Sequence, residues 1–295
     1  MRVGIDSYCF HRSFGDLWPG IDEDPGRRWT VFDVIRFAKE LGIAGVSLET
    51  CFMPALDAGF LRDLRGALDE AGLDRVLAWG HPTGLDGGAN PAALADLQQH
   101  VASAVALGTR TMRIVASLTR YSTELEAQFT RNLAPILRQA ARAAADQGVV
   151  LAIENHGDFT ADALLRLLER VDAPNLRVTL DTGNALRILE DPVEAARKLA
   201  PYTVATHIKD VTAGRGSPWD FLFWPATPVG QGAIDIPAIL QILADAGYQG
   251  LLCVEVDNPA SMWRRVSEEE LVRQSVAYLR EQVAQLGMRT DLARP

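Results

Sequence analysis

Four side chains with metal-binding chemistry each follow a short apolar run in the second half of the chain: Glu154, Asp181, His207 and Glu255. The first three lie 27 and 26 residues apart, close to the roughly 30 residues of one βα unit, and Glu255 follows after a further 48, enough for one unit and an insertion. If these runs are neighbouring parallel strands, their carboxyl ends bring three carboxylates and one imidazole together. This oxygen-rich set predicts a divalent-metal site and favours Mn²⁺ or Mg²⁺.

A single acid at a strand end is weak evidence, because such residues are ordinarily solvated or cap a helix. The alternative to a metal site is therefore a metal-free cleft with salt bridges. Strand parity supports a shared site, since the residues two positions before each candidate would also face the barrel interior. These residues are Ala152, Thr179, Ala205 and Cys253, the last of which we interpret as a packing residue.

Two residues just beyond these strand ends could contact a substrate. His156 follows Glu154 by two positions and could hydrogen-bond a substrate or carry a proton, or it could cap the following helix. Lys209 follows His207 by two positions and could neutralise a substrate oxyanion. The other interpretation of Lys209 and its neighbour Asp210 is an ion pair at the rim.

Polar residues also stand at the preceding strand ends. Glu49 and His81 end the second and third predicted strands, and Arg113 lies in the fourth. Buried charges usually have partners, so these residues predict either a structural network or contacts to substrate hydroxyls. Arg215, in the loop after the seventh strand, is a further substrate-binding candidate.

The elements that must position these residues alternate along the whole chain. Apolar runs predict eight strands, at residues 3–8, 45–49, 75–79, 111–116, 149–154, 178–181, 203–207 and 250–255. Caps and helical periodicity predict eight helices, near residues 31–41, 58–71, 91–107, 122–148, 160–170, 191–200, 237–246 and 267–286. The alternation predicts an α/β fold, a single-domain (β/α)₈ barrel over residues 1–295 with loop insertions near 9–28 and 211–234.

The second insertion is rich in aromatic residues: Trp219, Phe221, Phe223 and Trp224. It could form an oligomer contact, an aromatic wall over a sugar ring, or both. The GxG at Gly230 and Gly232 is a weak phosphate signal, and it does not follow a strand directly as a dinucleotide-binding loop would.

Composition excludes several classes of protein. The net charge of −9, from 38 acids and 29 bases, argues against a nucleic-acid partner. Three cysteines without a CxxC pair argue against a disulfide framework or a cysteine-based zinc site. The amino-terminal region lacks an apolar segment of signal-peptide type, and no uncharged apolar run reaches about 18 residues. We therefore expect a cytoplasmic protein with no membrane partner.

Five segments together resemble the xylose isomerase-like TIM-barrel superfamily of sugar isomerases and epimerases: IENHGD, LDTGN, THIKD, GQGAIDIPAIL and YQGLLCVEVD. The resemblance covers nearly the whole chain and is strongest from Val149 to Asp257. Within that superfamily the chain resembles ketose epimerases of the D-tagatose 3-epimerase type. Those enzymes bind Mn²⁺, Co²⁺ or Mg²⁺ through residues at the positions of Glu154, Asp181, His207 and Glu255. The resemblance implies that the protein binds one divalent ion, with Mn²⁺ preferred over Mg²⁺ or Co²⁺. It also implies a homo-oligomer, either a dimer or a tetramer.

The resemblance also implies the chemistry. Glu154 and Glu255 would shuttle the α-proton of a ketose or related polyhydroxy carbonyl compound, and the ion would stabilise the resulting enediolate. Asn184 stands where relatives often have a substrate-contacting histidine, so we expect it at the substrate. That departure keeps a second reaction open, dehydration of a keto-polyol of the inosose or 3-dehydroshikimate type. An endonuclease IV-like DNA repair enzyme and a non-catalytic sugar-binding protein are the remaining alternatives, disfavoured by the negative charge and by the four retained ligand types.

Overall fold

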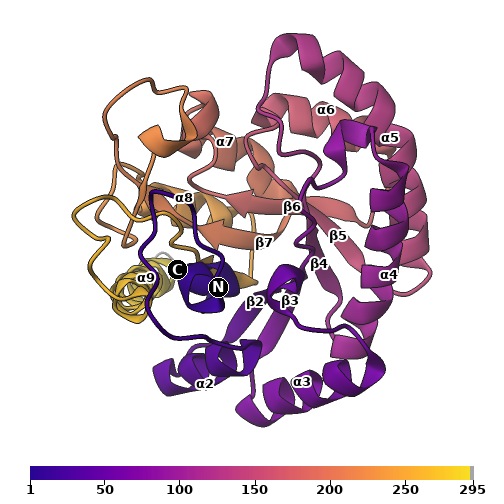
Figure 1. Ribbon diagram of the computed structural model, residues 1–295. Helices are drawn as coiled ribbons and strands as arrows, with labels where there is room; N and C mark the ends of the chain where they lie inside the picture. The colour runs from indigo at the N-terminus through magenta and orange to yellow at the C-terminus, as the bar shows by residue number, and fades with distance from the viewer. Residues whose placement is uncertain (293–295) are drawn as a thin grey trace.

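The computed structural model describes residues 1–292 and confirms the (β/α)₈ barrel (Figure 1). Eight parallel strands close in the order β1-β10-β7-β6-β5-β4-β3-β2, and a separate two-stranded sheet pairs β8 with β9. The barrel strands are β1 (Arg2–Asp6), β2 (Gly45–Glu49), β3 (Asp74–Ala78), β4 (Thr111–Ile114), β5 (Val150–Glu154), β6 (Leu176–Asp181), β7 (Thr203–Ile208) and β10 (Leu251–Val254). The short strands are β8 (Asp210–Val211) and β9 (Ala226–Thr227).

Helices between the strands form the outer ring seen in Figure 1. They are α1 (His11–Phe14), α2 (Val31–Leu41), α3 (Ala58–Ala71), α4 (Pro91–Leu107), α5 (Thr123–Ala145), α6 (Ala161–Val171), α7 (Pro192–Leu199), α8 (Ile236–Asp245) and α9 (Glu268–Leu292). Thr30 and Asp33 form a capping box at the start of α2, and left-handed glycines follow α2, α3 and α4, at Gly42, Gly72 and Gly108.

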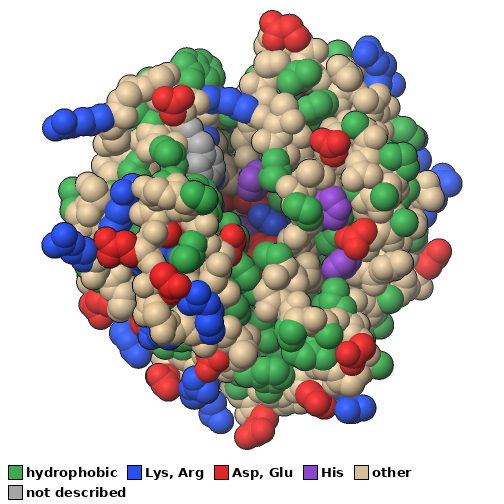
Figure 2. Space-filling model, in the orientation of Figure 1, with side chains coloured by type: hydrophobic (Ala, Val, Ile, Leu, Met, Phe, Trp, Pro, Cys, Tyr) green, Lys and Arg blue, Asp and Glu red, His purple; other side chains and the backbone are tan. Residues whose placement is uncertain are grey.

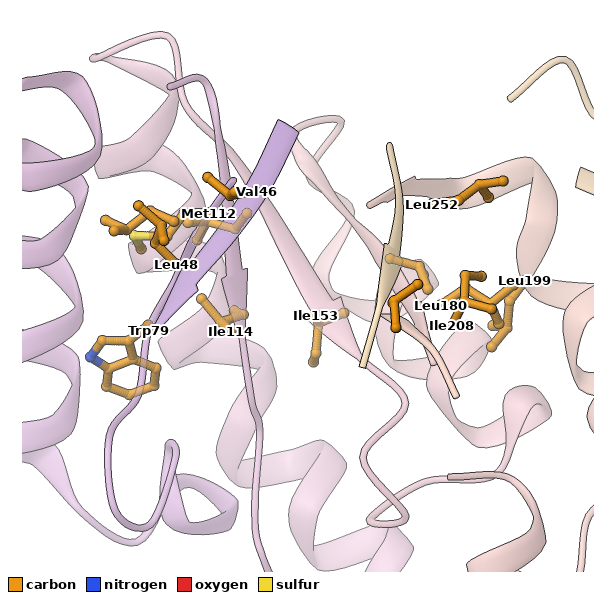
Figure 3. Close-up of a cluster of buried hydrophobic side chains, with 14 of the residues drawn as sticks. Val46, Leu48, Trp79, Met112, Ile114, Ile153, Leu180, Leu199, Ile208 and Leu252 are labelled. Atoms are coloured by element: carbon orange, nitrogen blue, oxygen red, sulfur yellow. The ribbon is translucent and has the colours of Figure 1, made fainter. Parts of the chain in front are cut away.

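The main core lies between the barrel and this ring. Helix α6 shows why: its apolar residues recur at a spacing of three or four, so one stripe faces the strands, whereas Arg166 and Glu169 face solvent. Figure 3 shows part of the same layer, where Leu199 of α7 lies beside Leu180 and Ile208 on neighbouring strands.

Small side chains fill the barrel interior below the predicted site. Ala152 and Ala205 pack with Val76 in a separate buried cluster, which confirms the parity predicted for these two alanines. Cys253 is buried, as expected for a packing residue. Short side chains here leave the longer acids and histidine one layer above to converge at the carboxyl end of the strands.

The register of the sheet sets which strand ends meet. Asp181 pairs with His207 across β6 and β7, and Glu154 of β5 pairs with Thr179, two residues before Asp181. Asp181 and His207 thus lie side by side, whereas Glu154 is offset from Asp181 by two residues, a stagger of the kind that barrel closure requires. The three predicted ligands therefore point into one space from three adjacent strands.

Both predicted insertions contain more structure than loops. In the first, residues Ser7–Phe10 form a 3₁₀ turn and α1 follows directly, so the long loop begins only after Phe14. In the second, β8 and β9 form an antiparallel pair at the base of the excursion. The side chain of Phe221 lies outside the described residues. Within residues 1–292, no helix combines the length and hydrophobicity needed to cross a bilayer.

Candidate functional site

Three of the four predicted ligands form a compact buried cluster. Ligand atoms of Glu154, Asp181 and His207 all lie within 4.8 Å of one another. Each side chain is at most 2% exposed, so the donors are held by packing rather than by solvent. A cluster of two carboxylates and one imidazole at this separation can hold a metal ion.

Glu255 lies beside this cluster. Its Oε2 atom is 2.7 Å from His207 Nδ1, yet neither atom has a hydrogen-bond partner of acceptable geometry. Asp181 Oδ2 also lacks one. A buried polar atom without a hydrogen-bond partner costs folding free energy. Three such atoms that face one point are the arrangement expected of side chains that coordinate a cation. The donor set therefore fits a divalent ion.

His207 is oriented by a residue that the sequence interpretation left out. Its Nε2 atom lies 3.4 Å from Asp6 Oδ2, so Nδ1 is the nitrogen that faces Glu154 and Glu255. Asp6 is itself fixed, because its Oδ1 accepts from the backbone N–H of Tyr8. A carboxylate behind a ligating histidine is a common means of fixing ring orientation. The available signal was an acid inside the first predicted strand, two residues before its end.

Arg113 links two acids and reaches the cavity. Its Nε donates to Glu154 and its Nη1 lies 3.3 Å from Glu49. Burial raises the pKa of Glu49 to about 7 despite the opposing charge of Arg113. For Glu154 burial acts in the same direction, but the charges of Arg113 and His207 outweigh it and hold the pKa well below its usual range. The structural network predicted for these residues therefore exists between Glu49 and Arg113 and extends to Glu154, which it keeps ionised, but no described contact joins His81 to it.

Lys209 lies at the centre of a second network. Its ammonium is 2.9 Å from Glu255 Oε1, 3.1 Å from Asp257 Oδ2 and 3.4 Å from Asp181 Oδ2. Burial opposes the lysine charge, but these carboxylates raise its pKa well above the usual value. Asp257 also faces Arg187 Nη2 at 3.5 Å. The predicted ion pair of Lys209 with Asp210 at the rim is therefore wrong: Lys209 is buried and pairs with other acids, whereas Asp210 accepts hydrogen bonds from backbone N–H groups.

Asp257 and Arg187 were not predicted as site residues. Asp257 shares the strand parity of Cys253 and Glu255, which was a usable signal. Arg187 follows β6 in a short 3₁₀ turn, and its Nη1 donates to Asn184 Oδ1 at 2.8 Å. No pattern in the sequence connects Arg187 with Asp257, because their contact spans 70 residues.

Asn184 is fully buried behind the cluster. Its Nδ2 donates to Glu154 Oε1 at 3.0 Å, and its backbone N–H donates to Asp181 Oδ1 at 2.9 Å. Asn155 does similar work between β5 and β6, because its side chain bonds both backbone groups of Asp181. Asn184 thus holds the Glu154 carboxylate and Asn155 holds the backbone of Asp181, and substrate contact by Asn184 stays a prediction.

A cavity of about 570 Å³ opens above the cluster. Figure 2 shows this hollow, with acidic, basic and histidine side chains inside it. Five predicted substrate-binding residues line it together with Glu255: Glu49, His81, Arg113, His156 and Lys209. Its size and its few converging polar groups are typical of a small-molecule site. Arg215 is exposed in the loop between β8 and β9, away from this lining.

The two histidines of the lining differ in their surroundings. Burial lowers the pKa of His156 to about 4, against the opposing charge of Glu154, so its imidazole is neutral at pH 7. His81 stacks on Trp79 with ring centroids 5.0 Å apart, and its Nδ1 accepts from the backbone N–H of Thr83. A neutral His81 therefore carries its proton on Nε2.

The segment after β1 forms one wall of the cavity through Tyr8, Asp16 and Trp18. It is anchored by buried polar contacts: His11 Nε2 lies 3.2 Å from Asp22 Oδ2, and the Glu268 carboxylate accepts from Arg12 and Ser13. His11 is only 1% exposed, although it falls within the predicted loop insertion near residues 9–28. The wall is thus tied to the start of α9.

The His11–Asp22 pair should make stability depend on pH. Burial would lower the pKa of His11, but the hydrogen bond and charge of Asp22 raise it overall above its usual value. The stabilisation is then complete below the ordinary histidine pKa of about 6.5 and is lost as pH rises through the raised value. We expect His11→Gln to cost about 2 kcal/mol in urea unfolding at pH 5.5 and clearly less at pH 9.

The matched control is the same substitution in an Asp22→Asn background, where its cost should no longer be larger at pH 5.5 than at pH 9. An equal cost at both pH values in the wild-type background would contradict the assignment of the pair.

The aromatic insertion is tied to the opposite side of the mouth. The guanidinium of Arg120, in the loop after β4, lies 4.4 Å from the ring centroid of Trp219 and donates to the carbonyl oxygens of Trp219 and Arg187. Trp219 itself is 55% exposed. A single arginine thus joins the loops that follow β4, β6 and β8.

A family model described as "Xylose isomerase-like TIM barrel" matches residues 35–282, most of the chain. The chain belongs to this family. Among curated relatives, 2-epi-5-epi-valiolone 7-phosphate 2-epimerase of Actinoplanes sp. is 31% identical over 212 residues, covering 68% of this chain and 73% of that protein.

Other curated relatives match shorter parts of this chain. Inosose dehydratase of Clostridium botulinum is 28% identical over 142 residues, which is 44% of this chain and 48% of the dehydratase. The chain thus spans about half the length of that relative. Among solved structures, the IOLI protein with a bound zinc atom superposes with a TM-score of 0.74 at 15% identity over 97% of this chain and 99% of that one. At that identity the likeness shows the shared fold.

Proposed function

We propose that this xylose isomerase-like protein is a divalent-metal-dependent isomerase or epimerase that moves the α-proton of a polyhydroxy carbonyl compound. The observation that carries the proposal is the cluster of Glu154, Asp181 and His207, with Glu255 beside His207, beneath a cavity with polar walls. A divalent ion held by these residues, Mn²⁺ in our proposal, would act as a Lewis acid that makes the α-proton of the substrate more acidic.

The chain's own residues supply the proton chemistry. Glu154 and Glu255 come from β5 and from the residue after β10, so their carboxylates approach the centre from different sides. Each could take a proton from one face of a substrate or return it to the other. Arg113 and Lys209 hold the two carboxylates ionised, with burial opposing them; the pKa of Glu255 is lowered to about 2 by Lys209 and His207.

Dehydration is the second candidate, favoured by one observation. His156 lines the cavity two residues beyond Glu154, where it could assist departure of a hydroxyl group β to the carbonyl. Loss of water after α-proton removal uses the same first step. A relative named inosose dehydratase gives this candidate independent support.

The experiment that tests the proposal is an NMR assay in D₂O with the Mn²⁺-loaded protein and a panel of ketoses, keto-inositols and 3-dehydroshikimate. The proposal expects deuterium next to the carbonyl and a product of unchanged composition. Formation of an enone or diketone with loss of water would assign the dehydratase reaction instead. No exchange with any substrate, in protein shown to hold its metal, would contradict both.

A further inference from the structure

The cavity wall carries more acidic than basic side chains, and this excess affects which substrates can enter. Four carboxyl side chains line the cavity, Asp16, Glu49, Glu255 and Asp257, against two permanent cations, Arg113 and Lys209. If a divalent ion is added, Glu154 and Asp181 in the layer below offset its two charges. With the ion bound, the wall and the layer below it together keep an excess of two carboxyl groups over positive charges.

Both cations are already committed to carboxylates. Arg113 contacts Glu154 and Glu49, and Lys209 contacts three acids within 3.4 Å. An incoming phosphate or carboxylate would have to displace one of these buried acids, which would leave that acid without a partner. Among the described residues of the lining, no arginine or lysine is left over for an anion.

A second place where barrels of this kind bind phosphate is also filled. Phosphate groups frequently sit at the loops after the last two barrel strands, on free backbone N–H groups. Here the N–H groups of Gly230, Gly232 and Ile234 donate to the carboxylate of Asp210 at 2.8–3.1 Å. A Cβ on Gly232 would come within 2.1 Å of Asp210 Oδ1, so the loop is moulded onto this carboxylate.

We propose that the cavity admits an uncharged polyhydroxy carbonyl compound and rejects the corresponding phosphate esters and carboxylic acids. The type of substrate in this inference rests on the proposed function. The preference for an uncharged substrate rests only on the charged residues of the cavity wall. Carboxylates on the wall can accept hydrogen bonds from hydroxyl groups, and the rings of Tyr8 and Trp18 offer an apolar surface to C–H groups. In this respect the chain differs from the relative whose name specifies a 7-phosphate.

The test compares matched pairs on the Mn²⁺-loaded protein: D-tagatose with D-tagatose 6-phosphate, and D-ribulose with D-ribulose 5-phosphate. Calorimetry gives the dissociation constants and NMR in D₂O gives the exchange rates. The neutral member should bind about 100-fold more tightly, because like charges are brought together in the other complex. A phosphorylated member that binds as tightly as its neutral partner, or neutral members that all fail to bind, would overturn the inference.

The two proposals fail in different ways. Neutral sugars that bind preferentially but exchange no proton would refute the proposed reaction and leave the charge preference intact. Exchange observed only with phosphate esters would do the reverse.

A charge reversal at the mouth gives a further check. Asp16 is exposed and its Oδ2 lies 3.4 Å from the Tyr8 hydroxyl, outside the ligand cluster. Asp16→Lys should lower the ratio of the two dissociation constants, phosphorylated over neutral, by about tenfold or more. The matched control is Glu70→Lys on the exposed face of α3, which makes the same change in net charge and should leave the ratio unaltered. Equal ratios in both variants would count against the electrostatic origin of the preference.

Discussion

Replacing Glu154 with glutamine is expected to slow α-proton exchange about 1,000-fold, the range typical of a lost general base. Glutamine keeps the volume of the side chain, and its single oxygen can still accept from Arg113 or from Asn184, but it has no basic carboxylate. Glu255→Gln should have a comparable effect, because the second glutamate returns the proton. The measurement is the initial rate of deuterium incorporation in D₂O with each variant at saturating Mn²⁺.

The control is Glu194→Gln, an identical change at an exposed position of α7, which should exchange at the wild-type rate. Circular dichroism and thermal unfolding would show that the site variants remain folded. Wild-type rates in both Glu154→Gln and Glu255→Gln would rule out proton transfer by the two glutamates.

His207→Ala should weaken metal binding by more than about 100-fold, because it removes the only nitrogen donor of the buried cluster in residues 1–292. Asp6→Asn should give a smaller loss of about tenfold, because the imidazole remains but its orienting carboxylate is gone. Calorimetric titration of the metal-free protein with Mn²⁺, and separately with Zn²⁺, would measure both effects.

His100→Ala is the matched control for these titrations. His100 lies on α4, where its Nδ1 bonds the carbonyl oxygen of Asp96 one turn earlier, so its loss should leave metal affinity unchanged. An unaltered affinity in His207→Ala would show that the ion, if bound, sits elsewhere.

Local sequence patterns were sufficient for the barrel and for the core of the candidate site. Each of the four candidate residues follows a mainly apolar run and lies at or within one residue of the end of its strand, and parallel strands place those ends on one face. Glu154, Asp181 and His207 could therefore be grouped without coordinates, and the structure brings them together. Glu255 was found by the same argument.

Contacts made by closing the barrel could not be read in this way. Asp6 reaches His207 only because β1 pairs with β10, which joins the two ends of the barrel. The same closure lets Glu268 accept hydrogen bonds from Arg12 and Ser13, about 255 residues away in the sequence. Part of a predicted loop is therefore a helical segment fixed to α9. Such partners lie far apart in the sequence and share no period, so no local pattern marks them.

Six side chains of the site form a row of alternating charge: Arg187, Asp257, Lys209, Glu255, His207 and Asp6. Every interior member has an opposite charge or a ring nitrogen on both sides, so changing one residue leaves two neighbours unmatched in a buried setting, at a cost of about 3–5 kcal/mol. Evolution should therefore alter this row by paired changes or not at all. New substrate preferences would arise instead in the loop walls, where Tyr8, Trp18 and Leu118 can vary one at a time.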